Sequence, residues 1–266
     1  MGGWVMMRRI TAFLILAALF LTLTGCEEKT NLLEGVIFGE GEVVDGSRPN
    51  QKYELPDTVT NRNDFQSKEP LLLLAAYSDG DGGTVTVCGV NDEDPRLLID
   101  WNGEQYEYEI SFLNTGGFSL QHAMMDVDED GTQELVIVEH SGTGTGVAVD
   151  YLYVLDYFDD VITAYQFPAH LYEVSVSSAL TDCINPWTGN LTLKAVTLKT
   201  PKFAELQVRL GQQVAYEIGQ NGITARFGLG YQVKDVPHQT YQGALTAKVG
   251  FSNGIFDISE FALVEE

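Results

Sequence analysis

The stretch DVDEDGTQELVIV, Asp126 to Val138, is the part of the sequence from which the fold can be worked out. Acidic side chains occupy every second position at its start: Asp126, Asp128 and Asp130. Gly131 then permits a sharp turn, and the four apolar residues from Leu135 to Val138 follow. A tight acidic turn that runs into an unbroken apolar segment indicates a corner that feeds a buried β-strand.

The same stretch carries the oxygen atoms of a cation site. Calcium is a hard cation that takes about six to eight oxygen ligands. Carboxylates held at close range repel one another when no cation lies between them. The alternative is an acidic β-turn that binds nothing. We predict a Ca²⁺ site formed by three alternating carboxylates, one backbone carbonyl and a later carboxylate: Asp126, Asp128, Asp130, Thr132 and Glu134.

The spacing of these residues resembles the calcium-binding loops of the FG-GAP and VCBS repeat families, D-x-D-x-D-G-x-x-[DE]-[LI], with a hydrophobic strand after it. Asp126, Asp128, Asp130, Gly131, Glu134 and Leu135 fill those positions, and the resemblance covers about residues 124–156. It implies a calcium-binding loop at the entrance to a β-sheet. The EF-hand matches less well, because its twelfth position requires a bidentate Glu and is Ile137 in this chain.

From Leu71 onward the sequence has the pattern of β-structure. Three Asn-Gly pairs, the dipeptide favoured in two-residue hairpins, indicate an antiparallel meander: Asn102-Gly103, Asn221-Gly222 and Asn253-Gly254. Residues 71–77 and 84–90 predict a further pair of strands about a turn at 78–83. We therefore expect an all-β fold, either an antiparallel sandwich or an open propeller-like sheet, with minor helix.

Two long segments differ in how they should be buried. Residues 146–158 are apolar on both faces and predict a central strand, whereas residues 204–214 alternate cleanly and predict a strand with one wet face. The loop 141–146, rich in Gly and Thr, lacks the Gly-Lys-Ser/Thr ending of a nucleotide-binding loop and is interpreted as a hairpin connection. Short helices are expected near 118–125 or 175–181.

The amino-terminal segment has the pattern of an export signal. Arg8 and Arg9 precede an apolar run from Ile10 to Leu23, which suits a signal-peptide core better than a membrane span. Leu23-Thr24-Gly25-Cys26 resembles the bacterial lipobox, which implies cleavage before Cys26 and acylation of its sulfur. The alternative is an ordinary secretory peptide. We expect a signal peptide at 1–25, a tether with short docked segments at 26–70, and a β-rich domain at 71–266.

Composition limits the partners of the chain. The 266 residues include 15 Lys and Arg against 38 Asp and Glu, a net charge of −23. Such a surface repels phosphate backbones and anionic lipid headgroups, which argues against nucleic-acid binding and against electrostatic docking on a membrane. It suits a protein that faces the extracytoplasmic side and meets cations there. The lipobox resemblance implies, in addition, that acylated Cys26 holds the chain on the lipid bilayer.

Catalytic patterns are weak. Glu139, His140 and Ser141 are consecutive, but adjacent strand residues point to opposite faces, so they do not predict a triad. The four histidines show no zinc-ligand spacing. Cys88 and Cys183 either form a disulfide or remain separate thiols.

These observations favour a non-enzymatic binding or structural module of the cell envelope with an unidentified ligand. The alternative is a calcium-dependent hydrolase of polysaccharide or peptidoglycan.

Overall fold

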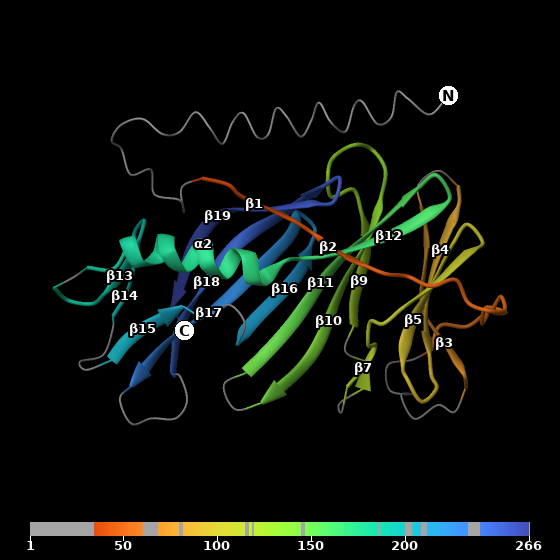
Figure 1. The fold of residues 1–266 in the computed structure, drawn as a ribbon, viewed down its shortest axis with the longest axis horizontal. Helices are drawn as coiled ribbons and strands as arrows, with labels where there is room; N and C mark the ends of the chain where they lie inside the picture. Colours follow the sequence, from red (N-terminus) through yellow and green to blue (C-terminus); the bar gives the residue numbers. More distant parts are fainter. Residues whose placement is uncertain are drawn as a thin grey trace. The chain divides into compact units, whose positions relative to one another are not determined.

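The structure of the chain, a computed structural model, describes residues 35–60, 69–79, 82–114, 117–118, 120–144, 147–185, 187–199, 204–208, 212–233 and 240–265. The predicted signal peptide, Cys26 and the first part of the tether lie outside these residues. The predicted all-β class is confirmed, since strands make up most of the described chain and α2 (Ala169–Asp182) is its only described helix. Figure 1 shows the arrangement.

The described strands follow in chain order: β1 (Ile37–Glu40), β2 (Glu42–Val44), β3 (Leu71–Ser78), β4 (Thr84–Val90), β5 (Arg96–Trp101), β6 (Glu104–Tyr108), β7 (Leu113–Asn114), β8 (Gly117–Phe118), β9 (Leu120–Met125), β10 (Glu134–Gly144), β11 (Val147–Phe158), β12 (Val161–Gln166), β13 (Leu191–Leu193), β14 (Val196–Leu198), β15 (Ala204–Val208), β16 (Gln213–Gly219), β17 (Gly222–Val233), β18 (Thr240–Ser252) and β19 (Ile255–Glu265).

Strand β11 is the branch point of the larger sheet, whose main order is β1-β19-β18-β17-β16-β11-β10-β9. Strand β10 pairs antiparallel along one edge of β11. On the other edge, the second half of β11 pairs with β12, while Ala148 and Val149 pair in parallel with Gln213 and Val214 of β16. This short parallel contact joins the strands around β10 to the carboxy-terminal meander.

The middle of β11, residues 152–155, is buried on both faces against different cores, as the sequence predicts for residues 146–158, whereas Val147, Tyr151 and Phe158 are exposed. Leu152 and Val154 belong to a core that includes α2 and the meander β16–β19. Tyr153 and Leu155 belong to a second core, formed with the separate four-stranded sheet β3-β4-β5-β6. The hydroxyl of Tyr108 in β6 donates to the carbonyl of Ile162 in β12 over 3.0 Å and links the two sheets.

Hairpins are confirmed at all three Asn-Gly pairs, and they connect β5 to β6, β16 to β17 and β18 to β19. Only Asn102-Gly103 and Asn253-Gly254 are themselves the two-residue turn. Asn102 (φ 54°) and Gly103 (φ 87°) both adopt the positive φ that a type I′ turn requires, and Asn253 (φ 52°) and Gly254 (φ 79°) do the same. At the third hairpin, Gly219 pairs with Gly222, so Gln220 and Asn221 form the connection. Of the Asn-Gly pair, only Gly222 (φ 115°) has positive φ.

The predicted hairpin between β10 and β11 is present, but residues 141–144, expected in its loop, extend β10, where Gly142 to Gly144 pair with β11; residues 145–146 lie outside the described chain.

The expected helix near 118–125 is wrong. Leu120 to Met125 form β9, which pairs with β10 from Leu120 opposite Glu139 to Met125 opposite Glu134. The segment contains good helix formers, but the backbone ladder with β10 outweighs a weak local propensity. The helix expected at 175–181 is confirmed as part of α2, which buries one stripe of side chains: Tyr172, Val176, Ala179 and Leu180.

The segment expected at 204–214 is not one strand in the described chain. Ala204–Val208 form β15 and Gln213–Gly219 form β16, and both strands pair with β17 at different heights. Residues 209–211 lie outside the described chain. β15 and β16 both pair with the same edge of β17. An alternating sequence pattern indicates strand structure but not where one strand ends and the next begins.

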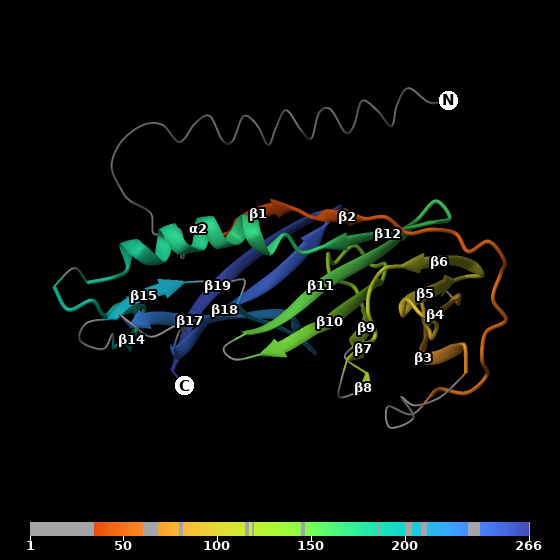
Figure 2. The same ribbon diagram turned by 60° about the horizontal axis from the view of Figure 1, so that its bottom comes forward.

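Residues 35–60 run across both sheets. Strand β1 pairs with β19 and β2 pairs with β12, and Ser47 then exchanges two backbone hydrogen bonds with Glu107 of β6. Figure 2 shows β1, β2 and β12 along the same side as α2. This stretch therefore connects the larger sheet to the four-stranded one.

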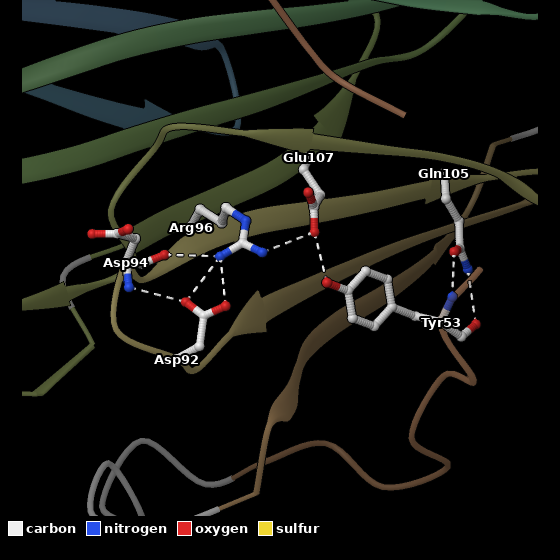
Figure 3. A network of polar contacts seen from close by, with 6 residues as sticks. All are labelled: Tyr53, Asp92, Asp94, Arg96, Gln105 and Glu107. Atoms are coloured by element: carbon white, nitrogen blue, oxygen red, sulfur yellow. Dashed lines mark hydrogen bonds and ion pairs between the residues drawn. The ribbon is translucent and has the colours of Figure 1, made fainter. Parts of the chain in front are cut away.

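Polar contacts fasten Tyr53 to the four-stranded sheet (Figure 3). Gln105, which is buried, accepts from the Tyr53 N–H over 2.8 Å and donates to the Tyr53 carbonyl over 3.1 Å. It also donates to the carboxylate of Asp100 over 2.8 Å. These buried polar groups are satisfied, which keeps their burial from being destabilising.

Cys88 and Cys183 do not form a disulfide; the first is buried and the second half-buried. Among the described residues, no helix combines the length and the apolar character needed to cross a bilayer.

Substituting Gly89 in β4 tests the packing between the sheets. A Cβ there would lie 2.5 Å from ring carbons of Phe112, which is fully buried. Gly89→Ala should lower the free energy of unfolding by about 1–3 kcal/mol, the usual cost of overpacking. Urea denaturation measures it. Adding Phe112→Leu should recover part of the loss, and purely additive effects of the two substitutions would contradict the clash.

Candidate metal centre

The predicted acidic loop lies between the neighbouring strands β9 and β10, so it turns the chain at one end of the larger sheet. Two residues of the loop have left-handed backbone conformations, Glu129 (φ 60°) and Gly131 (φ 94°). Nothing lies within 4 Å of a Cβ built on Gly131, so the φ value and not lack of space favours glycine there. We call residues 126–134 the acidic corner.

Hydrogen bonds within the acidic corner draw the carboxylates inward. Asp126 accepts from the N–H groups of Asp130 and Gly131, each over 3.1 Å. Asp130 accepts from the N–H and the hydroxyl of Thr132, over 2.8 and 2.5 Å. Asp126, Asp128 and Asp130 each bring a carboxylate oxygen within 4.8 Å of the others. Three of the five predicted ligands, the aspartates, thus converge on one point.

Glu134 lies at the base of the acidic corner and is only 3% exposed. Its carboxylate accepts from the Val127 N–H over 2.8 Å and lies 3.5 Å from the Thr132 hydroxyl. Burial, followed by the neighbouring aspartates, raises the pKa of Glu134 to about 7. The surroundings of this side chain therefore disfavour its negative charge.

Asp156 is the site residue that the sequence analysis missed. Leu135 of β10 pairs with Leu155 of β11. Extending this antiparallel register by one residue puts Asp156 of β11 opposite Glu134 of β10, on the same face of the sheet. Burial and the charge of Asp130 raise the pKa of Asp156. Asp156 also contributes to raising the pKa of Asp128, after burial and the charges of Asp130 and Asp126. No spacing within the loop could have pointed to a residue on another strand.

The chemistry of this donor set fits a hard divalent cation. The available side-chain atoms are carboxylate and hydroxyl oxygens, which Ca²⁺ and Mg²⁺ prefer as ligands, with no nitrogen or sulfur donor among them. Like-charged side chains on facing strands are destabilising unless something offsets the repulsion. A divalent ion would provide that offset.

Two other polar side chains lie further along β10, on opposite faces. Glu139, 8% exposed, accepts from the Tyr153 hydroxyl over 2.9 Å and from the Ser111 N–H over 3.2 Å. His140 has its Nδ1 atom 2.6 Å from Asp150. Because their partners lie on different faces, Glu139 and His140 do not act on a common atom, as the sequence indicates.

Comparison of the chain with protein-family models, with curated proteins and with solved structures found no match.

The buried charge of Glu139 should be visible in the pH dependence of stability. Burial raises its pKa above the value in the unfolded chain, so ionisation opposes folding, and this contribution grows as pH rises from about 4 through the raised pKa. Glu139→Gln cannot ionise, so it should match the parent protein near pH 4 and exceed it in stability at pH 8. Urea unfolding at both pH values measures the difference.

The control is Glu217→Gln, which removes an exposed carboxylate from β16. It should leave the pH dependence of the parent protein unchanged. A Glu139→Gln variant whose stability followed pH in parallel with the parent protein would contradict the effect of burial.

Proposed function

We propose that this protein is an exported, lipid-anchored component of the cell envelope, in which the acidic corner holds a structural Ca²⁺ ion and the β-rich domain acts as a binding or structural module. The observation that carries the proposal is the convergence of three aspartate carboxylates beside the buried Glu134. The ligands of the Ca²⁺ ion would be Asp126, Asp128, Asp130, Thr132 and Glu134, with Asp156 beside them.

The ion would act on stability. Carboxylates that repel one another in the metal-free protein become attracted to a common charge, so the free energy of binding adds to the free energy of folding. Because Asp156 lies on β11, a cation here would draw the β9–β10 turn toward the central strand of the sheet. Extracellular calcium sites have dissociation constants of about 0.1–1 mM, which suits a site whose aspartates are partly exposed to solvent.

Calcium should therefore raise the melting temperature of the full chain. At 10 mM Ca²⁺, a site of this class contributes about 1.4–2.7 kcal/mol, or a rise of about 3–10 °C for a chain of this size. Scanning calorimetry with and without Ca²⁺ measures the rise. Asp128→Ala should abolish most of it, whereas Asp57→Asn, at an exposed position outside the acidic corner, should retain it. An equal rise in all three proteins would exclude the acidic corner as the site.

The anchor is supported by the sequence of the amino-terminal segment, which lies outside the described residues. Several acyl chains on one cysteine hold a protein on a bilayer, at about 0.8 kcal/mol per buried CH₂ group. A strongly acidic domain gains nothing from electrostatic attraction to anionic lipid, so a covalent anchor would supply the membrane affinity that its surface lacks.

Acylation can be followed by labelling. Bacteria that express the full chain in the presence of radioactive palmitate should incorporate label into the parent protein and into a Cys183→Ala control. The Cys26→Ala variant should incorporate none and should leave the membrane fraction. Label retained by Cys26→Ala would rule out this cysteine as the anchor.

A further inference from the structure

A cleft lies between the four-stranded sheet and β10, separate from the acidic corner. Its volume is about 960 Å³, and it is lined by the β4–β5 turn (residues 92–96) together with Glu109, Ser111 and Glu139. The turn belongs to one sheet and Glu139 to the other, so the cleft exists only because the two sheets pack together. Its size is at the upper end of the range for small-molecule sites and far exceeds what a single metal ion needs.

Glu139 is a buried carboxylate without a cationic partner among the described residues. It is 8% exposed, and its two oxygens each accept one hydrogen bond, from the Ser111 N–H and the Tyr153 hydroxyl. These donors fix its orientation, but neither carries a charge. A carboxylate can accept about four hydrogen bonds, so part of its capacity is unused. Buried charges in proteins are normally paired, and burial raises the pKa of this unpaired one.

Arg96 is the cation on the cleft wall, and other groups already engage it (Figure 3). Its Nη1 atom lies 2.9 and 2.8 Å from the two carboxylate oxygens of Asp92 and donates to the Asp94 carbonyl over 3.0 Å. Its Nη2 atom donates to Glu107 over 3.1 Å, and Glu107 also accepts from the Tyr53 hydroxyl. The charge of Arg96 is therefore compensated within the four-stranded sheet.

The remaining carboxylates of the cleft give it a negative charge. Glu93, Asp94 and Glu109 are exposed at its wall, and Glu139 lies at its buried end. A cavity lined by one sign of charge concentrates ligands of the opposite sign. An ammonium group has three N–H donors and no acceptor, which matches a site made of carboxylate oxygens.

We propose that this cleft binds a small organic cation, with one primary ammonium group on the Glu139 carboxylate and further ammonium groups near Glu93 and Glu109. Such a ligand supplies the counter-charge that Glu139 lacks and fills a cleft too large for an ion. The inference is independent of the calcium proposal, because no residue of the acidic corner lines the cleft.

Isothermal titration of the full chain with spermidine tests the proposal. The titration is made in 150 mM NaCl, which screens exposed charges, and in 10 mM CaCl₂, which shields the acidic corner from the polyamine. Saturable binding is expected. Glu139→Gln should weaken it about tenfold or more, because a charge-assisted hydrogen bond is lost. Since this variant should be more stable at neutral pH, its loss of affinity would not reflect unfolding.

Matched variants separate the cleft from general attraction to an acidic protein. Glu109→Gln, at an exposed position on the cleft wall, should also weaken spermidine binding, whereas Glu217→Gln on β16 should change it less than about twofold. A parallel titration with trilysine distinguishes a free polyamine from a lysine-bearing peptide, and saturable binding of either supports the ammonium site. Failure of both to bind, or equal losses in the Glu139 and Glu217 variants, would overturn it.

Discussion

The fold depends on the ladder between β10 and β11, whose central residues are buried on both faces. Val136, Val138, Leu152 and Val154 pack into the core with α2 and the meander, while Leu135, Ile137, Tyr153 and Leu155 pack into the core with the four-stranded sheet. A strand buried on both faces removes the apolar side chains of both faces from water. Each Å² of apolar surface buried stabilises the fold by about 25 cal/mol. Both cores, and the cleft between the sheets, are positioned by this pair of strands.

The acidic groups of interest follow from the same ladder. Glu134 and Asp156 lie opposite each other near one end, and Glu139 lies further along β10 on the face toward the four-stranded sheet. A strand buried on both faces leaves little water for a charged side chain, so each of these carboxyl groups has a raised pKa. Bound cations would compensate the negative charge of these carboxylates at two places. The proposed cation is a metal ion at the acidic corner and an organic cation in the cleft.

Local sequence predicted the elements whose conformation is set by their own residues. Asn102-Gly103 and Asn253-Gly254 both adopt the positive φ that their turns need, and residues 152–155 are apolar at successive positions, which suits a strand segment covered on both sides. Local sequence failed for Leu120–Met125, which contains good helix formers yet forms β9, because the partner strand that decides its conformation lies after the acidic corner. The division of residues 204–219 into β15 and β16 is likewise decided by β17, a strand later in the chain.

By itself, the sequence determined the all-β class, the positions of the tight turns and the clustering of Asp126, Asp128 and Asp130, because each depends on residues close together in the chain. Only the tertiary structure decided that Asp156 joins this corner and that Glu139 meets the β4–β5 turn across a cleft. Pairing register and sheet packing bring those groups together, and both arise from contacts between segments that are distant in sequence.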